Sequence, residues 1–178
     1  MTKYVEAHFG SGTTLVIRNA SKVLLVDDVT SNQRPATSDQ AREHLRAAMA
    51  RHTQDDIDGA LAEARRALEI APDYADAHSY LGSTLVQRLG RFAEGLAALE
   101  RARELAPDDP AMHYTLGWCY EFVAHRMKRR PQEGFDPQEL YRKAEASLRR
   151  CLELHPEGKL KDDAQDLLSS IIREDVGP

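Results

Sequence analysis

Cysteine and long apolar runs are scarce in this chain, and each scarcity argues against a class of protein. The 178 residues contain two cysteines and one tryptophan. Cys119 and Cys151 have neither CxxC spacing nor histidines crowded beside them, which argues against a disulfide framework and a zinc site. No stretch approaches the roughly 18 apolar residues of a membrane helix, and Glu6 and His8 interrupt the start where a secretory signal is apolar. We therefore expect a cytoplasmic protein with no membrane insertion, metal or cofactor.

Charge of a single sign is also lacking. The net charge is −5, and acidic and basic residues are mixed along most of the length. With 30% charged and 42% hydrophobic residues, eight prolines and ten glycines, the composition is typical of a globular chain with one domain or a short repeat array. Nothing in this balance indicates bulk attraction to nucleic acid, which is not expected as a partner.

A catalytic constellation is missing as well. Nucleophile, base and orienting group have to converge in an enzyme. Here the serines fall in turns or on helix surfaces, and most carboxylates fall at solvated helix positions. We therefore predict that the chain is not an enzyme and has no catalytic residues.

What the sequence does contain is a repeat. Three segments end with an apolar residue, one spacer and a proline, at Pro72, Pro107 and Pro156. Proline cannot continue a helix and disfavours helical geometry in the preceding residue, so each proline marks a helix end at the same structural phase. The prolines are 35 and then 49 residues apart. The first interval is close to a period of about 34 residues, and the second is that period plus an insertion of about fifteen.

Other positions recur in phase with the prolines. Leu81-Gly82 precedes Leu85 as Leu116-Gly117 precedes Tyr120, and small residues stand at two positions of each following helix: Ala60, Gly95 and Ala144, then Ala67, Ala102 and Cys151. In this pattern the chain resembles the tetratricopeptide repeat family, with a degenerate first repeat. The resemblance implies a mainly α protein, an α-solenoid of antiparallel helix pairs.

The expected organisation has three parts. Residues 37–157 hold three repeats, at 37–74, 75–109 and 110–157, the last with an insertion near 122–136. Residues 158–178 form a capping helix and tail, because Leu160, Ala164, Leu167, Leu168, Ile171 and Ile172 make one apolar stripe. Helix starts are predicted from a capping box at Thr37 and Gln40, and from Asp109 and Asp136 before prolines. The first helix of the third repeat is expected to continue to about Arg129.

Residues 1–36 differ in kind. Thr13–Arg18 and Lys22–Val26 are rich in Leu, Val and Ile, which predicts a β-hairpin, or a short β-meander with Tyr4–Phe9 as a third strand. An isolated hairpin is only marginally stable in water, so we expect this one to dock. The chain's own helices are the favoured surface because the linker is short, and a second copy or the partner are the alternatives.

In the family, first helices of successive repeats line a concave groove that receives a peptide. Carried over by phase, the lining positions in this sequence are Leu45, Met49, Ser79, Ser83, Val86, Tyr114, Trp118 and Phe122. Repeats that bind chaperone tails use lysine, asparagine and arginine at such positions, and the apolar residues here argue against that role. The resemblance and the lining together predict a hydrophobic or amphipathic peptide as partner. The alternative is that Tyr114, Trp118 and Phe122 are covered by the hairpin or the insertion.

Two further groups of residues carry charge or potential ligand atoms. Arg126, Lys128, Arg129 and Arg130 either contact an acidic partner or simply place cations favourably at a helix C-terminus. His44, His78 and His113 fall at the tryptophan position of the family on successive repeats, too far apart along the stack to share a metal ion.

The sequence therefore favours a non-catalytic protein–protein interaction module, as an adaptor, scaffold or chaperone-like protein. The alternative is a structural subunit that self-associates as a homo-oligomer, through the N-terminal hairpin or the repeat array.

Overall fold

The computed structural model describes residues 4–9, 13–18, 23–27 and 38–175. The chain divides into two compact units, Met1–Ala36 and Thr37–Pro178.

In the first unit the described residues form a three-stranded antiparallel sheet. Its strands are β1 (Tyr4–Phe9), β2 (Thr13–Arg18) and β3 (Val23–Asp27), in the order β1-β2-β3. The register places Val5 opposite Ile17 and Leu15 opposite Leu25. Each strand thus pairs with its neighbour in the sequence, as in a meander. Lys22, where the third strand was expected to begin, lies outside the described residues.

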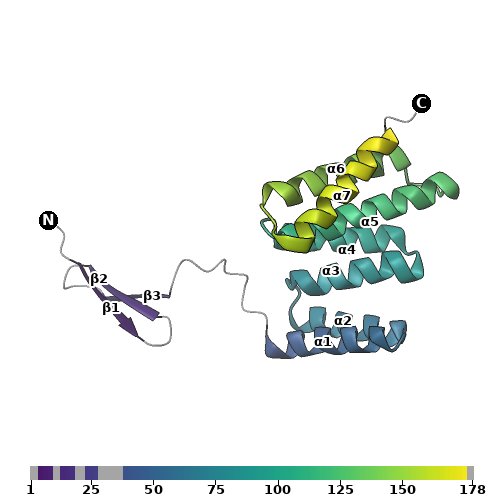
Figure 1. Ribbon diagram of the computed structural model, residues 1–178. Helices are drawn as coiled ribbons and strands as arrows, with labels where there is room; N and C mark the ends of the chain where they lie inside the picture. Colours follow the sequence, from purple (N-terminus) through teal and green to yellow (C-terminus); the bar gives the residue numbers. More distant parts are fainter. Residues whose placement is uncertain (1–3, 10–12, 19–22, 28–37, 176–178) are drawn as a thin grey trace. The chain divides into compact units, whose positions relative to one another are not determined.

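The second unit is a stack of helix pairs (Figure 1). In chain order these are α1 (Asp39–Thr53), α2 (Ile57–Ile70), α3 (Ala75–Thr84), the π-helical turn η1 (Leu85–Leu89), α4 (Phe92–Leu105), α5 (Pro110–Arg129), α6 (Pro137–Glu153) and α7 (Gly158–Asp175). The pairs are α1 with α2, α3 with α4 and α5 with α6, and each packs on the next. The predicted mainly α solenoid is confirmed.

Polar side chains fix where the helices begin. Asp109 and Asp136 are the N-cap residues of α5 and α6, as predicted, and each carboxylate accepts a backbone N–H hydrogen bond, at 2.9 and 3.0 Å. The prediction for α1 is wrong by one residue. Its N-cap is Ser38, whose hydroxyl oxygen accepts from the third helical N–H at 3.1 Å, and Thr37 lies outside the described residues.

Glycine lets the helices of one pair approach closely. A methyl group at Gly82 of α3 would lie 2.6 Å from the carbonyl oxygen of Gly95 on α4, and one at Gly95 would lie 2.7 Å from the carbonyl oxygen of Gly82. In the next pair a methyl group at Gly117 would lie 2.9 Å from Leu148 Cγ. The Leu-Gly pattern in the sequence therefore marks the point where paired backbones nearly touch.

The π-turn η1 accommodates an extra residue of the second repeat. Ala48 and Ala60 are twelve positions apart in the first repeat, whereas Gly82 and Gly95 are thirteen apart in the second. A π-turn holds more residues than an α-turn, so it takes up this residue without breaking the helix. The segment then ends at Gly90, whose φ of +65° suits a residue without a side chain.

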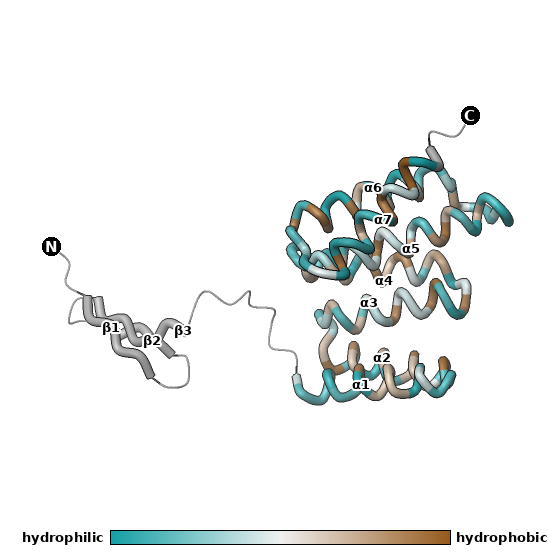
Figure 2. The backbone as a smooth tube through the Cα atoms, in the orientation of Figure 1, coloured by the Kyte–Doolittle hydropathy of each residue, from teal (hydrophilic) through white to brown (hydrophobic). Residues whose placement is uncertain are grey.

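The largest apolar core extends from α4 to α7. Ala164 and Ile171 of α7 are buried in it together with Leu116 of α5 and Leu148 of α6. Figure 2 shows the alternation of hydrophobic and hydrophilic residues along α7 that this packing requires. The predicted capping stripe is confirmed at these two positions, whereas Ile172 is 40% exposed.

The insertion of the third repeat is a helical extension and a loop. α5 ends at Arg129, as predicted, and α6 begins at Pro137. Phe135 of the loop packs edge-on against Phe92 of α4, with ring centroids 6.2 Å apart. The extension is held to α6 by Lys128, whose Nζ lies 4.4 Å from the ring centroid of Tyr141. The insertion thus packs on α4 and α6.

None of the described helices has the length and apolar character of a membrane span.

Candidate partner-binding groove

The first helices of the second and third repeats border an open surface cavity. It has a volume of about 260 Å³ and is lined by Ser83, Gln87, Tyr114, Thr115 and Trp118. Ser83 and Gln87 come from the α3–η1 segment, and the other three residues come from α5. Since α3 and η1 both contact α5, the cavity walls are held by packed helices rather than by loops.

Aromatic and basic side chains form a column along α5. Trp118 and Phe122 are one turn apart, and their rings stack at a centroid distance of 5.5 Å and an interplanar angle of 19°. The guanidinium carbon of Arg126, one further turn along, lies 5.8 Å from the Phe122 ring centroid. Trp118 and Phe122 are half-buried and pack against the α4–α7 core. One side of this aromatic pair is therefore fixed and the other is accessible.

Charged residues of α7 act on Tyr114. Burial raises the pKa of the Tyr114 hydroxyl above its ordinary value, and the nearby carboxylate of Asp163 raises it further. Asp163 itself is paired with Lys159, with 2.7 Å between Nζ and Oδ2. The ion pair on α7 thus lies near Tyr114, one of the residues that line the cavity.

The structure separates the eight predicted lining residues into three groups. Ser83, Tyr114 and Trp118 share the cavity, and Phe122 continues its aromatic side. Ser79 is half-buried and Met49 is 49% exposed, and neither lines this cavity. The remaining two, Leu45 and Val86, are 4% and 1% exposed.

The prediction that Leu45 and Val86 line the groove is therefore wrong. Leu45 packs in the core between the first and second repeats, with Ala41, Ala67 and Ala77. Val86 lies in η1, where its Cγ2 would be 2.7 Å from a methyl group at Gly95. Neither side chain is accessible to a partner.

Gln87 and Thr115 line the cavity but were missed. Gln87 follows Ser83 by four residues, the same interval at which Trp118 follows Tyr114 on α5. The signal in the sequence is this four-residue interval, which favours Gln87 over Val86 as the groove position. Thr115 donates a hydrogen bond to the Ala111 carbonyl at 2.9 Å. In the sequence, only its position next to Tyr114 indicates that Thr115 lines the cavity.

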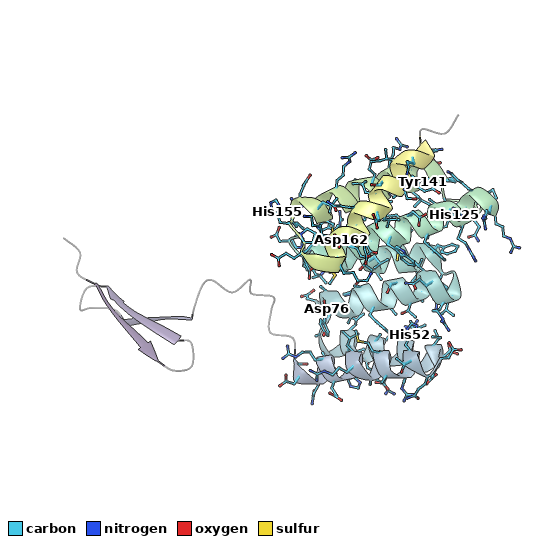
Figure 3. The ribbon with its side chains drawn as sticks, in the orientation of Figure 1. His52, Asp76, His125, Tyr141, His155 and Asp162 are labelled. Atoms are coloured by element: carbon cyan, nitrogen blue, oxygen red, sulfur yellow. The ribbon has the colours of Figure 1, made fainter. Side chains whose placement is uncertain are left out.

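The four basic residues predicted as a group are split by their contacts. Lys128 is held over the Tyr141 ring. Arg126, Arg129 and Arg130 are exposed and, with His125, line a second cavity of about 390 Å³ at the C-terminal end of α5. Figure 3 shows His125 near this end of the helix.

The repeated histidines make structural hydrogen bonds. Nε2 of His78 lies 2.8 Å from the carbonyl oxygen of Pro72, and Nε2 of His113 lies 2.8 Å from that of Pro107. His44 instead bonds Glu63, with 2.8 Å between Nδ1 and Oε2. Among the residues described, no three His, Cys, Asp or Glu side chains are grouped so that they could hold a metal ion.

Cys119 and Tyr120 of α5 are buried in the core. Burial raises the pKa of the Cys119 thiol to about 12. The pKa of Tyr120 is also raised, first by burial and then by its hydrogen bond to Glu100, whose carboxylate accepts from the hydroxyl. A protonated thiol and a phenol held in a hydrogen bond pack the core and are poorly suited to nucleophilic chemistry.

Comparison with known proteins identifies the repeat. A family model for the tetratricopeptide repeat matches residues 51–119. No curated protein matches the sequence.

Several solved structures share the fold. The first TPR of Spaghetti (RPAP3), bound to the HSP90 peptide SRMEEVD, is 17% identical with a TM-score of 0.62, over 78% of this chain and 94% of that one. The TPR2B-domain:pHsp70 complex of yeast Sti1 is 18% identical with a TM-score of 0.62, over 77% and 99%. The Yersinia enterocolitica type III secretion chaperone SycD, in complex with a peptide of the translocator YopD, is 13% identical with a TM-score of 0.60, over 78% and 96%. At such identities the similarity concerns the fold.

Proposed function

We propose that this tetratricopeptide repeat protein is a non-catalytic interaction module that binds a hydrophobic or amphipathic segment of another protein beside Trp118. The observation that carries the proposal is the cavity of about 260 Å³ between the α3–η1 segment and α5, with Tyr114 and Trp118 in its wall. Its role in the cell would be that of an adaptor, scaffold or chaperone-like protein.

Half-buried aromatic side chains on a rigid helix suit this task. Trp118 and Phe122 are already ordered by stacking on each other and by packing on the core, so binding costs little side-chain entropy. Tryptophan and tyrosine combine a large apolar area with a polar atom at the rim, and both are frequent anchors of interfaces. A partner side chain that fills the cavity would bury the accessible faces of both rings.

Three of the similar structures contain peptides or chaperone partners, which supports peptide binding by this fold. The chemistry of the groove differs from that of a site for a terminal carboxylate. Basic and amide side chains clamp the carboxylate in the chaperone-tail group, whereas Leu45, Met49 and Trp118 stand in their place in this sequence. We therefore propose an internal apolar segment rather than a charged chain end as the ligand.

Trp118 provides the first test, since it is the only tryptophan. Peptides are selected on the full-length protein from a random phage-displayed library and then titrated while Trp118 emission is recorded. We expect apolar or amphipathic peptides that shift the emission. Trp118→Ala should weaken their binding by about 2 kcal/mol, or about thirtyfold, in fluorescence anisotropy with labelled peptide.

Two matched variants control this measurement. Trp118→Phe keeps an aromatic ring and should retain part of the affinity, and Leu89→Ala removes an exposed apolar side chain outside the cavity lining and should bind as wild type. Equal binding by Trp118→Ala and wild type would disprove the groove proposal. If Trp118 emission instead changes with protein concentration alone, and light scattering shows a dimer, a second copy occupies the groove and the self-associating alternative holds.

A further inference from the structure

The arginines at the end of α5 differ from many other arginines of the solenoid in their surroundings. Several exposed arginines elsewhere are paired locally, as Arg101 is with Asp73 at 3.0 Å and Arg149 with Glu145 at 2.6 Å, although exposed Arg65 has no carboxylate partner among the described residues. Within the described part of the chain, Arg126, Arg129 and Arg130 have no carboxylate oxygen within 4.0 Å. Three positive charges are thus left uncompensated in a protein of net charge −5.

These arginines also converge. Together with His125 they line the cavity of about 390 Å³ at the end of α5. Favourable interaction with the helix dipole requires positive charge in the last turn, but it does not require three guanidinium groups to surround one space. Lys128 lies in the same turn and is packed over Tyr141 instead, so the convergence is specific to the arginines.

Residues of the arginine cavity continue the four-residue spacing of the groove residues on α5. Tyr114, Trp118, Phe122, Arg126 and Arg130 follow one another at intervals of four, and the contacts of Phe122 with Trp118 and with Arg126 show that the column is formed. Trp118 and Arg126 are separated by about 12 Å of helix rise. An extended peptide covers that distance with about four residues.

From this arrangement we infer that the arginine cavity binds an acidic stretch, made of carboxylate side chains, about four residues along the chain from the apolar segment seated at Trp118. The inference deepens the proposed function and rests on it for the position of the partner. Guanidinium groups bind carboxylates through paired N–H donors, which supplies orientation as well as affinity. The acidic stretch would therefore fix the direction in which the partner lies along α5.

A charged probe tests the arginine cavity separately from the groove. The binding of a fluorescein-labelled peptide of eight glutamates to the full chain is measured by anisotropy, at low salt and at about 0.15 M salt, with eight glutamines for comparison. We expect the glutamate peptide to bind, the affinity to fall as salt rises, and the triple variant R126A/R129A/R130A to lose about tenfold or more.

The matched control is R91A/R142A/R149A. It removes the same charge from three exposed arginines that are each paired with a glutamate. This control and Trp118→Ala should bind the glutamate peptide as wild type does. Circular dichroism establishes that each variant is folded.

Three results would overturn the inference: equal binding of the glutamate and glutamine peptides, equal loss in both triple variants, or tighter binding of single-stranded oligothymidylate through the same arginines. The library selection separates the two proposals. Trp118-dependent peptides without acidic residues would leave the proposed function standing and remove the acidic stretch.

Discussion

At the scale of single residues, the best example of a buried polar contact is Glu63 of α2. Its side chain is 10% exposed, and one carboxylate oxygen is 2.8 Å from His44 Nδ1 while the other is 3.0 Å from Arg66 Nη1. The hydrogen bond with His44 is the main cause that lowers the pKa of Glu63, and it prevails over burial, which would raise it. The ionised carboxylate therefore ties α2 to α1.

This pKa shift gives a dependence of stability on pH. A carboxyl group whose pKa is lower in the folded than in the unfolded state stabilises the fold above its ordinary value, here 4.5, and loses that contribution as the pH falls through the lowered pKa. Glu63→Gln should therefore unfold at lower urea concentration at pH 7 and lose less stability on acidification than wild type. Urea unfolding between about pH 7 and pH 3 measures both.

Glu69→Gln, on the same helix but exposed, controls for the change of net charge. If the stability of wild type and Glu63→Gln changes in parallel throughout that range, the carboxylate contributes nothing to the acid response of the fold.

At the scale of elements, two contacts recur from repeat to repeat. The carbonyl oxygen of the repeat-ending proline bonds the histidine six residues later, at Pro72 and at Pro107. The aspartate after each proline pairs with an arginine of the next second helix, Asp73 with Arg101 at 3.0 Å and Asp108 with Arg150 at 3.5 Å. Proline thus does more than end a helix, because its turn also links two successive repeats.

We predict that replacing a glycine where paired helices cross lowers the free energy of unfolding most where the new methyl group would meet a backbone atom. In a free helix, Gly→Ala is stabilising by up to about 1 kcal/mol. At Gly82 the new methyl group would lie 2.6 Å from a backbone oxygen of α4, which cannot move without separating the helices. We expect Gly82→Ala to lower the free energy of unfolding by about 1–3 kcal/mol.

Gly117→Ala is the comparison for this substitution. Its nearest neighbour is the Leu148 side chain at 2.9 Å, which can rotate, and the nearest backbone oxygen is at 3.2 Å. The loss should be smaller than at Gly82 when both variants are unfolded in urea. An equal or larger loss of unfolding free energy at Gly117 would mean that contact with the backbone oxygen does not determine how much these substitutions destabilise the protein.

At the scale of the molecule, contacts in a solenoid join neighbouring repeats, and an end helix has to cover the last repeat. α7 has this role, since Ala164 and Ile171 are in the same core as Cys119 and Cys151. Both thiols are buried, and burial raises the pKa of each, that of Cys119 to about 12. The folded chain therefore presents no reactive thiolate from these residues.

Thiol labelling tests the contribution of α7. With a disulfide reagent at about pH 8, full-length protein should react only as it unfolds, because thiolate and access are both lacking. A chain ending at Glu157 should react faster at the same pH, since its last repeat has lost the helix that covers it. Equal labelling rates of the two chains in absence of denaturant would show that the third repeat needs no cap.

Much of the fold follows from local features. Proline, small residues and apolar periodicity are local signals, and they correctly predict the helix pairs, the N-caps at Asp109 and Asp136, the extension of α5 to Arg129 and the capping helix. The resemblance to the family, carried over by helical phase, predicts which helix of each repeat faces the groove. Ser83, Tyr114 and Trp118 meet there as the helical phase requires.

Only the tertiary structure decides which of these side chains are accessible. Leu45 and Val86 belong to the first helices of their repeats but are buried, because burial depends on how closely the next helix approaches. The arginines after Phe122 are a charge run in the sequence, and the local spacing at the end of α5 places Arg126, Arg129 and Arg130 around one cavity, whereas tertiary packing places Lys128 over Tyr141 of α6. Short-range preferences thus determine the helices, and long-range packing determines the binding surface.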